Sequence, residues 1–500
     1  METFERFRRR MAEIVDLRRV TSLLFWDQQT MMPPAGAAVR SEQRATLNRL
    51  AHELFVSDET GRLLEELRSY EESLDPDSDE ASMIRVTRAD YEKLRRVPAE
   101  LAAEMTRAGS DGLQAWAKAK QESDFASFLP ALERNVELRR RYIECFDDYD
   151  EPYDVLLDDF ERGMKTAEVR AVFDELKAEL VPLIREVGER GDDGDDAFLR
   201  GTFPVDRQEA VGRAVVDAFG FRPGSWRLDP TSHPFAGGGG VSDIRITTHY
   251  READLDSLFA TMHEYGHGIY EHQVAPELER TPLGSGVSLG LHESQSRMWE
   301  NLVGRSLPFW RFFYPRLQDA FPEQLGGVDV ERFYRAVNRV QPSLIRIHAD
   351  EVTYNMHIIL RFELEQDIVN GEVELRDLPQ TWAERMDAYL GIEVPDDARG
   401  VLQDMHWAGG QIGYFSTYSL GNVMSVQIWE RVLEDIPDLY ERIERGDFAP
   451  LREWLGERIH RHGRKFLPAE TLERAVGTPI DAGPYLRYLR DKHGSGALAA

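Results

Sequence analysis

The sequence predicts a mainly α-helical protein with one small β element in its second half. Apolar residues recur at three- and four-residue spacing, among arginine and glutamate, through residues 40–70 and 90–145. This spacing is typical of amphipathic helices. The pattern breaks at residues 231–250 and resumes from residue 252 almost to the C-terminus. Because 500 residues exceed what one small core needs, we expect two or three lobes.

The break in the helical pattern has the sequence TSHPFAGGGGVSDIRITTHY. Its second half is rich in β-favouring residues, so we expect a short hairpin or edge strands there. The run Gly237–Gly240 is not followed by Gly-Lys-Ser/Thr, which excludes a phosphate-binding P-loop. The glycine run is either a mobile flap or a plain flexible loop. Upstream, the acidic stretch GDDGDDAF at residues 191–198 predicts a solvated loop and a possible lobe boundary.

Composition excludes several classes of protein. No apolar run approaches the roughly eighteen residues that span a bilayer. The N-terminal segment METFERFRRRMAEIV lacks the apolar core of a signal peptide. A net charge of -29 argues against nucleic acid and anionic membranes as partners, because both bind basic surfaces. The single cysteine, Cys145, excludes an internal disulfide and predicts a reducing, cytoplasmic location.

The excess of acidic residues also suggests a habitat. Lysine is scarce, and arginine supplies most of the positive charge. A surface of this kind is typical of proteins kept soluble in very high salt, where screening removes most of the self-repulsion. We therefore predict a halophilic-type acidic surface, which carries no information about chemistry.

The strongest chemical signal is the sequence His263-Glu264-Tyr265-Gly266-His267 within a predicted helix over residues 254–273. His263 and His267 are four positions apart, so both imidazoles project from one face of the helix. This spacing suits two ligands of one tetrahedral zinc ion, with Glu264 beside them to handle the proton of a water molecule. The alternative interpretation is a pair of surface histidines on an acidic helix.

A zinc site of this kind needs a third ligand. The metzincin arrangement requires Gly and His at positions that hold Tyr270 and Gln273 here. Glu271 and His272 belong to the same rigid helix as the two histidines and lie outside comfortable reach. A separate helix is therefore the better source.

That helix is predicted after a run of proline and glycine, in the segment LHESQSRMWENL at residues 291–302. Glu293 lies near its start and gives a His₂Glu ligand set with an open fourth position. Glu300, two turns later, is the alternative ligand. A carboxylate at a helix start can also do no more than complement the helix dipole.

Several segments spread over nearly the whole chain match one family pattern. They are FWDQQTMMPPAGAAVRSEQ (25–43), HPF (233–235), DIRIT (243–247), HEYGH (263–267), HESQ (292–295), IRIHAD (345–350) and GVLQDMHW (400–407). In these segments the chain resembles the carboxypeptidase Taq family of metallopeptidases. Ser416 departs from the pattern, which has proline there.

The resemblance implies a two-lobed helical metallopeptidase fold with a deep central groove, similar to neurolysin and angiotensin-converting enzyme. We expect residues 1–205 to form a helical lobe that covers the groove and residues 206–500 to form the catalytic lobe. The implied activity is a zinc-dependent carboxypeptidase that releases single amino acids from peptides with a free C-terminus, with Glu264 activating a metal-bound water. Cobalt can substitute for zinc at such ligands. A homodimer is also implied.

Peptide hydrolysis further needs a group that stabilises the developing oxyanion. The glycine-rich segment 403–421 offers His406, Tyr414 and Tyr418. The gap between His406 and Tyr418 is similar to that in the neurolysin-type clan, where such a pair faces the tetrahedral intermediate. The alternative is that these residues are ordinary aromatic residues of the core or the groove wall.

A carboxypeptidase must also bind a terminal carboxylate, and the planar fork of arginine does so best. Arg346 is the first choice, on a predicted helix over residues 344–365, where Asp350 would orient its guanidinium from behind. Arg245 is the second choice, and Tyr414 is expected beside the substrate. An ordinary surface pair of Arg346 with Asp350 is the alternative. Supporting roles for Asp243, His233 and Asp404 are plausible but unassigned.

Other functions remain to be weighed against this one. A helical oligopeptidase that cuts internally or removes dipeptides would use the same metal chemistry. An aminopeptidase is disfavoured because the Gly-x-Met-Glu-Asn pattern is absent upstream of His263. A non-catalytic acidic scaffold that keeps a metal for stability would have no use for Glu264.

Overall fold

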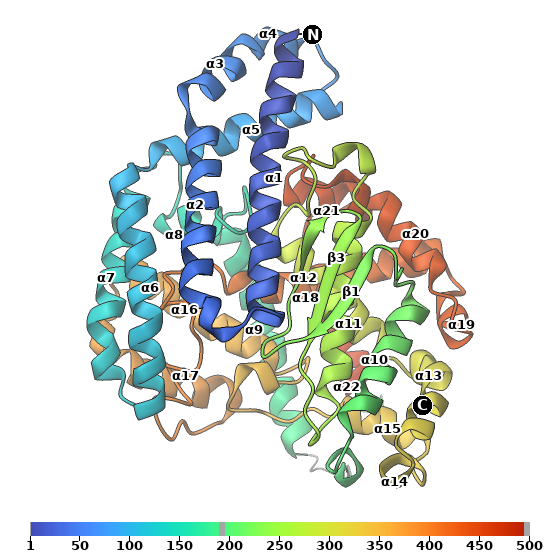
Figure 1. Ribbon diagram of the computed structural model, residues 1–500. Coiled ribbons are helices and arrows are strands. Elements are labelled where there is room, and N and C mark those ends of the chain that lie inside the picture. Colours follow the sequence, from blue (N-terminus) through green and yellow to red (C-terminus); the bar gives the residue numbers. More distant parts are fainter. Residues whose placement is uncertain (1, 190–195, 495–500) are drawn as a thin grey trace.

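The computed structural model describes residues 2–189 and 196–494, which are mostly helical with one small sheet (Figure 1). The predicted mainly α class is confirmed. Residues 191–195 of the predicted acidic loop lie outside the described residues. Within the described ranges, no helix is long and apolar enough to cross a membrane.

The N-terminal helices begin with a long α1 that runs beside α2 (Figure 1). The two predicted helical regions are each divided by a capping residue: Ser57 accepts a hydrogen bond from Thr60 N, and Asp124 accepts one from Ser127 N. The helices are α1 (Glu2–Thr30), α2 (Ala37–Val56), α3 (Asp58–Glu66), α4 (Arg68–Glu72), α5 (Asp79–Arg96), α6 (Ala99–Glu122), α7 (Phe125–Ile143), α8 (Pro152–Leu157), α9 (Thr166–Glu189) and α10 (Val205–Phe219).

Helices resume after the sheet and continue to the C-terminal end of the described chain. One π-helical stretch, Met298–Val303, directly follows α12. These helices are α11 (Asp256–His272), α12 (Leu289–Arg297), α13 (Leu307–Ala320), α14 (Pro322–Leu325), α15 (Val330–Val337), α16 (Tyr354–Asn370), α17 (Leu378–Leu390), α18 (Ser416–Asp435), α19 (Leu439–Glu444), α20 (Ala449–Arg458), α21 (Pro468–Val476) and α22 (Gly483–His493).

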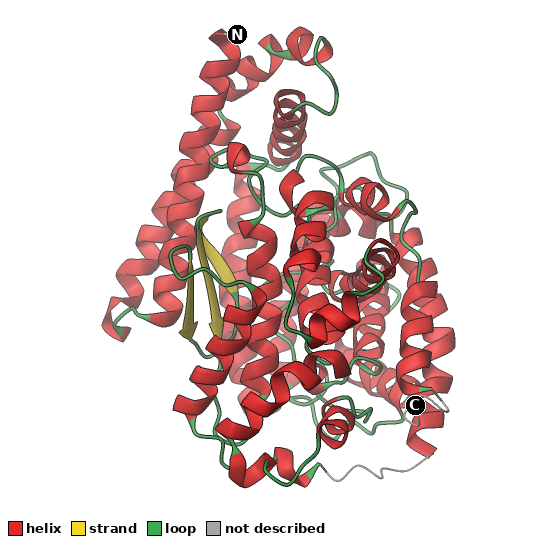
Figure 2. Cartoon of the chain, turned by 90° about the vertical axis from the view of Figure 1, so that its right-hand side faces the viewer, coloured by secondary structure: helices red, strands yellow, loops and turns green. Residues whose placement is uncertain are grey.

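The small sheet is drawn in yellow in Figure 2. It contains β1 (Trp226–Pro230), β2 (Ala236–Gly240) and β3 (Asp243–Thr248) in the order β1-β3-β2. The expected hairpin is present as the antiparallel pair β2–β3, with Ala236 opposite Ile246. The glycine run lies within β2, so its interpretation as a plain loop is wrong. Strand β1, which pairs in parallel with β3, was not expected. The sheet contacts α1 through β2 and α11 through β3.

Two groups of buried apolar side chains hold the chain together. The larger one draws on residues from Ala119 to Leu489. The smaller one joins helices α1, α2, α3 and α5 to the later residues Val241, Val274, Leu278 and Leu283. Because the larger core extends to both sides of residue 205, the division there stays a prediction.

The predicted helix over residues 344–365 is wrong in its first half. Residues Arg346–His348 form a single 3₁₀ turn, and α16 begins only at Tyr354. The Asp350 carboxylate accepts hydrogen bonds from Val352 N and Thr353 N at 2.9 and 3.0 Å. A side chain that bonds nearby backbone in this way stabilises a turn at the expense of a continuous helix.

Candidate metal centre and substrate-binding wall

Helix α11, which carries the His263–His267 motif, is largely buried, and its histidine face keeps partial exposure. Tyr265 is fully buried, and its ring centroid lies 5.4 Å from that of Trp226 and 5.0 Å from that of Trp299. The side chains of His263 and His267, on another face, retain 19% and 18% exposure. Packing of Tyr265 therefore fixes the rotation of the helix and directs both imidazoles outward.

The structure brings together the three residues predicted to bind metal. His263 Nε2 and His267 Nε2 lie 3.6 and 3.5 Å from Glu293 Oε2, and the three donor atoms lie within 4.8 Å of one another. A tetrahedral zinc ion with bonds of about 2.0–2.2 Å separates its ligands by roughly 3.3–3.6 Å. The donor types and the two histidine–carboxylate distances therefore fit a zinc ion.

Glu293 reaches the histidines because α12 lies very close to two other helices. A Cβ atom at Gly266 of α11 would lie 2.4 Å from Gln295 O, and one at Gly421 of α18 would lie 2.7 Å from the Glu293 Cβ. Any side chain at Gly266 or Gly421 would push α12 away. The glycine inside the motif thus has a packing role that the ligand spacing alone does not reveal.

Hydrogen bonds behind the two histidines fix their tautomers. His263 Nδ1 lies 2.9 Å from Glu300 Oε2. Desolvation raises the pKa of Glu300, but Arg297 and His263 lower it to about 2, so this carboxylate is ionised and accepts. The proton is on Nδ1, and the Nε2 lone pair of His263 faces the candidate metal position. Glu300, the alternative ligand, therefore lies behind a ligand rather than among the three.

A longer relay does the same for His267. Its Nδ1 lies 2.6 Å from His292 Nδ1, and His292 Nε2 lies 3.1 Å from Glu271 Oε1. Desolvation raises the pKa of Glu271, but His292 and Arg19 bring it down to about 2, so Glu271 accepts from His292 Nε2. A proton on His267 Nδ1, directed at His292 Nδ1, leaves the His267 Nε2 lone pair free.

Glu264 lies beside the three ligands and has no such partner. Its side chain is buried, and Oε2 makes no hydrogen bond among the described residues. Desolvation raises its pKa to about 7. A carboxylate with this pKa can both take up and release a proton near neutrality.

Arg346, the predicted carboxylate anchor, is buried, but its partner is not Asp350. Its Nε and Nη2 donate to Asp404 Oδ1 at 3.1 and 2.8 Å, and Nη1 donates to Tyr354 OH at 2.9 Å. Arg361, fully buried on α16, donates through Nε to the other oxygen of Asp404 at 2.8 Å. Two guanidiniums thus share one carboxylate, which leaves one positive charge uncompensated.

The predicted oxyanion residues form one aromatic wall that reaches Arg346. His406 Nε2 lies 3.3 Å from Tyr418 OH, and the rings of Tyr414 and Tyr418 are 5.3 Å apart. The Arg346 guanidinium lies 4.9 Å from the centre of the Tyr418 ring. Burial lowers the pKa of His406 to about 4, whereas burial and Tyr414 hold the pKa of Tyr418 well above its usual value. At pH 7 the imidazole is neutral and the phenol keeps its proton.

Arg245, the second choice for the anchor, lies elsewhere. It forms a two-point ion pair with Asp243 on β3 and stacks 4.5 Å over the Trp26 ring of α1. Within the described residues, no hydrogen bond or ion pair links Arg245 to Arg346 or to the metal ligands. His233 is exposed and forms no hydrogen bond with any described residue.

Sequence reasoning missed three groups that the structure places next to the predicted ones. Arg297 donates to Glu293 Oε1 at 2.8 Å, and its spacing of four residues from Glu293 was a usable signal. His292 directly precedes Glu293 on α12 and faces His267 of α11. Nothing in the sequence around His292 predicted the direction of its side chain. Arg361 meets Asp404 across 43 positions of the chain, which no local pattern reveals.

Comparisons with known proteins identify the family of the chain. The family model of carboxypeptidase Taq (M32) metallopeptidases matches residues 6–493. Thermostable carboxypeptidase 1 of Thermus thermophilus is 41% identical over 491 residues, 96% of each chain. The crystal structure of an M32 carboxypeptidase from Deinococcus radiodurans superimposes with a TM-score of 0.96 at 40% identity over all of both chains. Metallocarboxypeptidase 1 of Trypanosoma cruzi gives a TM-score of 0.94 at 32% identity over 99% of each chain. The chain therefore belongs to the carboxypeptidase Taq (M32) family and is a metallocarboxypeptidase.

Proposed function

We propose that this metallocarboxypeptidase depends on zinc and removes one residue at a time from peptides with a free C-terminus. His263, His267 and Glu293 would hold the metal, since their free donor atoms converge within 4.8 Å. Zinc suits two imidazoles and a carboxylate, and cobalt is the expected functional substitute. When bound, the metal supplies a Lewis acid that lowers the pKa of water and polarises a carbonyl group.

The protein's own groups then move the protons. Glu264 Oε2, buried and free of hydrogen bonds, takes a proton from the attacking water and delivers it to the leaving amine nitrogen. Tyr418 OH, which stays protonated, donates a hydrogen bond to the oxyanion as charge develops there. Neutral His406 orients that hydroxyl from 3.3 Å away. Tyr414 forms the adjoining part of the wall against which the substrate lies.

One observation carries the exopeptidase assignment: two buried guanidiniums, Arg346 and Arg361, share the single carboxylate of Asp404. The uncompensated positive charge favours an anion, and the terminal carboxylate of a peptide supplies it. Arg346 is the group that contacts the substrate, because its guanidinium adjoins Tyr418, whereas Arg361 is fully buried.

The experiment compares free-acid and amidated forms of one peptide in wild type, Arg346→Ala and Arg245→Ala. We expect Arg346→Ala to lower kcat/KM for the free acid by roughly ten- to several-hundred-fold, the effect of a charge-assisted contact. The amide should be a poor substrate of the wild type and hardly respond to the mutation. Arg346→Lys should restore activity only in part. A selective loss in Arg245→Ala alone would move the anchor to β3.

The second candidate is a helical oligopeptidase with the same metal chemistry. It takes over if the wild type cleaves both peptide forms equally well, or if mass spectrometry finds internal cuts or released dipeptides. A homodimer, a cytoplasmic location and a lobe boundary near residue 205 also remain proposals. They rest on the family resemblance and on composition, and sedimentation velocity would test the dimer.

A further inference from the structure

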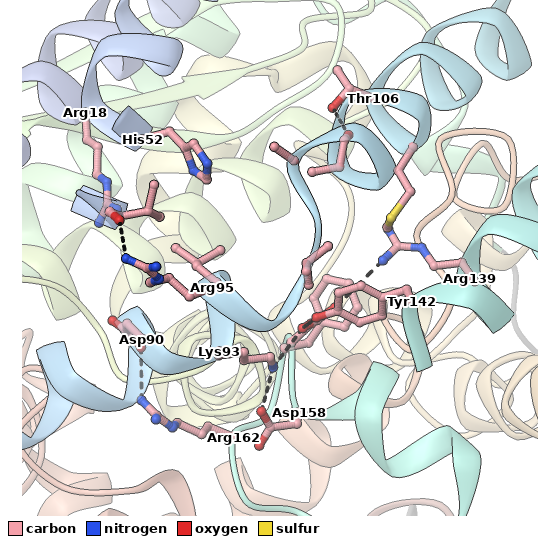
Figure 3. A pocket seen from close by; sticks show the side chains of 18 of the residues that line it. Arg18, His52, Asp90, Lys93, Arg95, Thr106, Arg139, Tyr142, Asp158 and Arg162 are labelled. Carbon is pink, nitrogen blue, oxygen red and sulfur yellow. Dashed lines mark hydrogen bonds and ion pairs between the residues drawn. The ribbon is translucent and has the colours of Figure 1, made fainter. Parts of the chain in front are cut away.

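A cavity of about 1000 Å³ lies between the N-terminal helices and the catalytic part of the chain. Figure 3 shows Arg18, Asp90 and Arg162 on one side of it and Arg139 and Tyr142 on the other. Its acidic lining residues are Asp58, Asp90, Asp158 and Asp159. Its basic lining residues are Arg18, Lys93, Arg95, Arg139, Arg162 and Arg464. A lining with more basic than acidic groups is unexpected in a chain of net charge -29.

The charges in this cavity are unevenly compensated. Lys93 Nζ pairs with Asp158 and Asp159 at 2.5 and 2.7 Å, and Arg139 pairs with Asp159 at 3.8 Å. Two cations therefore balance the two carboxylates of that part. Arg162 and Arg464, by contrast, both pair with Asp90, at 3.0 and 3.1 Å. Within the described residues, neither arginine pairs with another carboxylate.

Arg18, on α1, adds a third guanidinium to the same place. Among the described residues it forms no hydrogen bond or ion pair, and it lies 5.0 Å over the Phe55 ring. Its pKa is lowered by desolvation in the concave wall and by Arg464, whereas Asp90 raises it. Three guanidiniums around one carboxylate form a cationic cluster that can accept an anion. We call Arg18, Asp90, Arg162 and Arg464 the Asp90 cluster.

A file of aromatic side chains connects this cavity to the substrate anchor. Phe160 lines the cavity, and its ring lies 5.2 Å from that of Tyr414. Tyr414 lies 5.3 Å from Tyr418, which lies 4.9 Å from the Arg346 guanidinium. Three steps of about 5 Å span at most roughly 15 Å, the length of four or five extended residues. A peptide anchored at Arg346 is therefore long enough to reach Phe160, at the wall of the cavity, with a residue about four or five positions upstream of its C-terminus.

We propose that the Asp90 cluster is a subsite for an acidic side chain of the substrate, at the fourth to sixth residue from the C-terminus. This inference rests on the proposed function, which sets the direction of the peptide. The ligand is a side-chain carboxylate, bound by Arg18 with support from Arg162 and Arg464. Peptides too short to reach the cavity gain nothing from an acidic residue.

The test uses N-acetylated heptapeptides with a common C-terminal residue and a single Glu or Gln moved from the second to the seventh position from the C-terminus. At low ionic strength we expect kcat/KM to favour Glu over Gln by about three- to tenfold at the fourth to sixth positions and by less than about twofold elsewhere. Arg18→Gln should bring the ratio to about one, and Asp90→Asn should raise it. Arg8→Gln removes the same charge from an exposed part of α1 and should not change the ratio.

Two results would overturn the subsite: a Glu preference that is the same at every position, or equal ratios in the Arg18 and Arg8 variants. If Arg18→Gln does not fold, the direction of change in Asp90→Asn decides. Calorimetric binding of the Glu and Gln peptides to metal-free protein gives a second measure without catalysis. Failure of the proposed function gives a different result. In that case the enzyme would not release single C-terminal residues even from the Gln peptides.

Discussion

The two ends of the substrate wall are opposite in charge. The metal end holds three carboxylates, Glu264, Glu293 and Glu300, and among the described residues two guanidiniums, Arg297 and Arg305, pair with Glu293 and Glu300. At the anchor end, among the described residues, Arg346 and Arg361 form ion pairs with Asp404 alone. Buried charges are costly when they are unpaired, so each imbalance marks the place of a missing partner. The excess of carboxylates at the metal end favours a cation, and the excess of guanidiniums at the anchor end favours an anion.

The two ends also differ in how the chain builds them. The metal end comes from α11 and α12, two neighbouring helices held together by the close contact at Gly266. The anchor end joins a 3₁₀ turn, the helix α16 and the loop that carries Asp404, with Arg346 and Asp404 58 positions apart. We therefore expect the metal end to be robust to changes elsewhere and the anchor end to depend on distant contacts.

The largest effect is expected at the metal end, from Glu264→Gln. Turnover should fall by roughly two to four orders of magnitude because the proton carrier is lost. Metal content should stay nearly unchanged, since Glu264 is not among the three converging donors. Turnover and metal content are measured on the same preparation.

Glu300→Gln is the matched control for this change, because it alters another buried carboxylate at the same end. It should weaken metal affinity by roughly 10- to 100-fold, since Glu300 fixes the tautomer of His263. Equal loss of metal and activity in Glu264→Gln would show that Glu264 is a ligand and that the comparison assigns it the wrong role.

The next effect concerns Glu365, which supports the anchor end. This fully buried carboxylate accepts from Tyr153 OH, Trp407 Nε1 and Gly413 N at 2.6, 2.7 and 3.0 Å. Desolvation raises its pKa from 4.5 to about 7. A raised folded-state pKa gives stability that is complete below the unfolded pKa and is lost as the pH rises through the folded one. The contribution of Glu365 to the free energy of unfolding should therefore fall by at most about 3 kcal/mol between pH 4.5 and 7.

Glu365→Gln should remove this contribution and flatten the denaturant-derived stability curve over the same pH range. Glu161→Gln, at another buried carboxylate with a pKa of about 7, is the matched variant that leaves the anchor end intact. If the wild type and Glu365→Gln show the same pH dependence, Glu365 is ionised in the fold and the burial argument fails for this group.

A smaller effect tests the charge surplus at the anchor end. Arg361→Met keeps a long apolar side chain but leaves Asp404 to Arg346 alone, so the surplus disappears. We expect kcat/KM for free-acid peptides to fall about tenfold, with little change for amidated peptides or in metal content. Arg361→Lys keeps the charge and should retain most of the selectivity. An equal loss for free-acid and amidated peptides would mean that Arg361 is purely structural.

The same contrast explains what could be read from the sequence. His263 and His267 were predictable because a spacing of four on a helix fixes their relative direction. Glu293 was predictable as the third ligand because a run of proline and glycine ends the first helix and Glu293 lies near the start of the next one. The surroundings of Arg346 did not follow, because Asp350 turns back to the backbone at Val352 and ends the predicted helix. Its true partner, Asp404, is brought in by tertiary packing, which no local spacing encodes.

The Asp90 cluster shows the same limit. Arg18, Asp90 and Arg464 come from widely separated parts of the sequence, and only their charge balance in space points to a ligand. The sheet gives a milder example, because the glycine run was recognised as unusual but not as a strand. Side-chain periodicity carries no signal in a strand made of glycine.

The smallest effect expected from any single group is that of salt on the exposed charges. It distinguishes the exposed surface from the two buried ends of the substrate wall. If the net charge of -29 is an adaptation to high salt, the melting temperature should rise from dilute buffer to molar salt as surface repulsion is screened. Each exposed charge contributes only about 0–1 kcal/mol, so the rise comes from the whole surface. Over the same range, the preference for free-acid over amidated peptides should change little, because Arg346 and Asp404 are buried and screened less.

A flat or falling melting temperature would contradict the habitat prediction. A preference that collapses with salt would show instead that the anchor acts as an exposed charge, and the contrast between surface and buried ends would no longer hold.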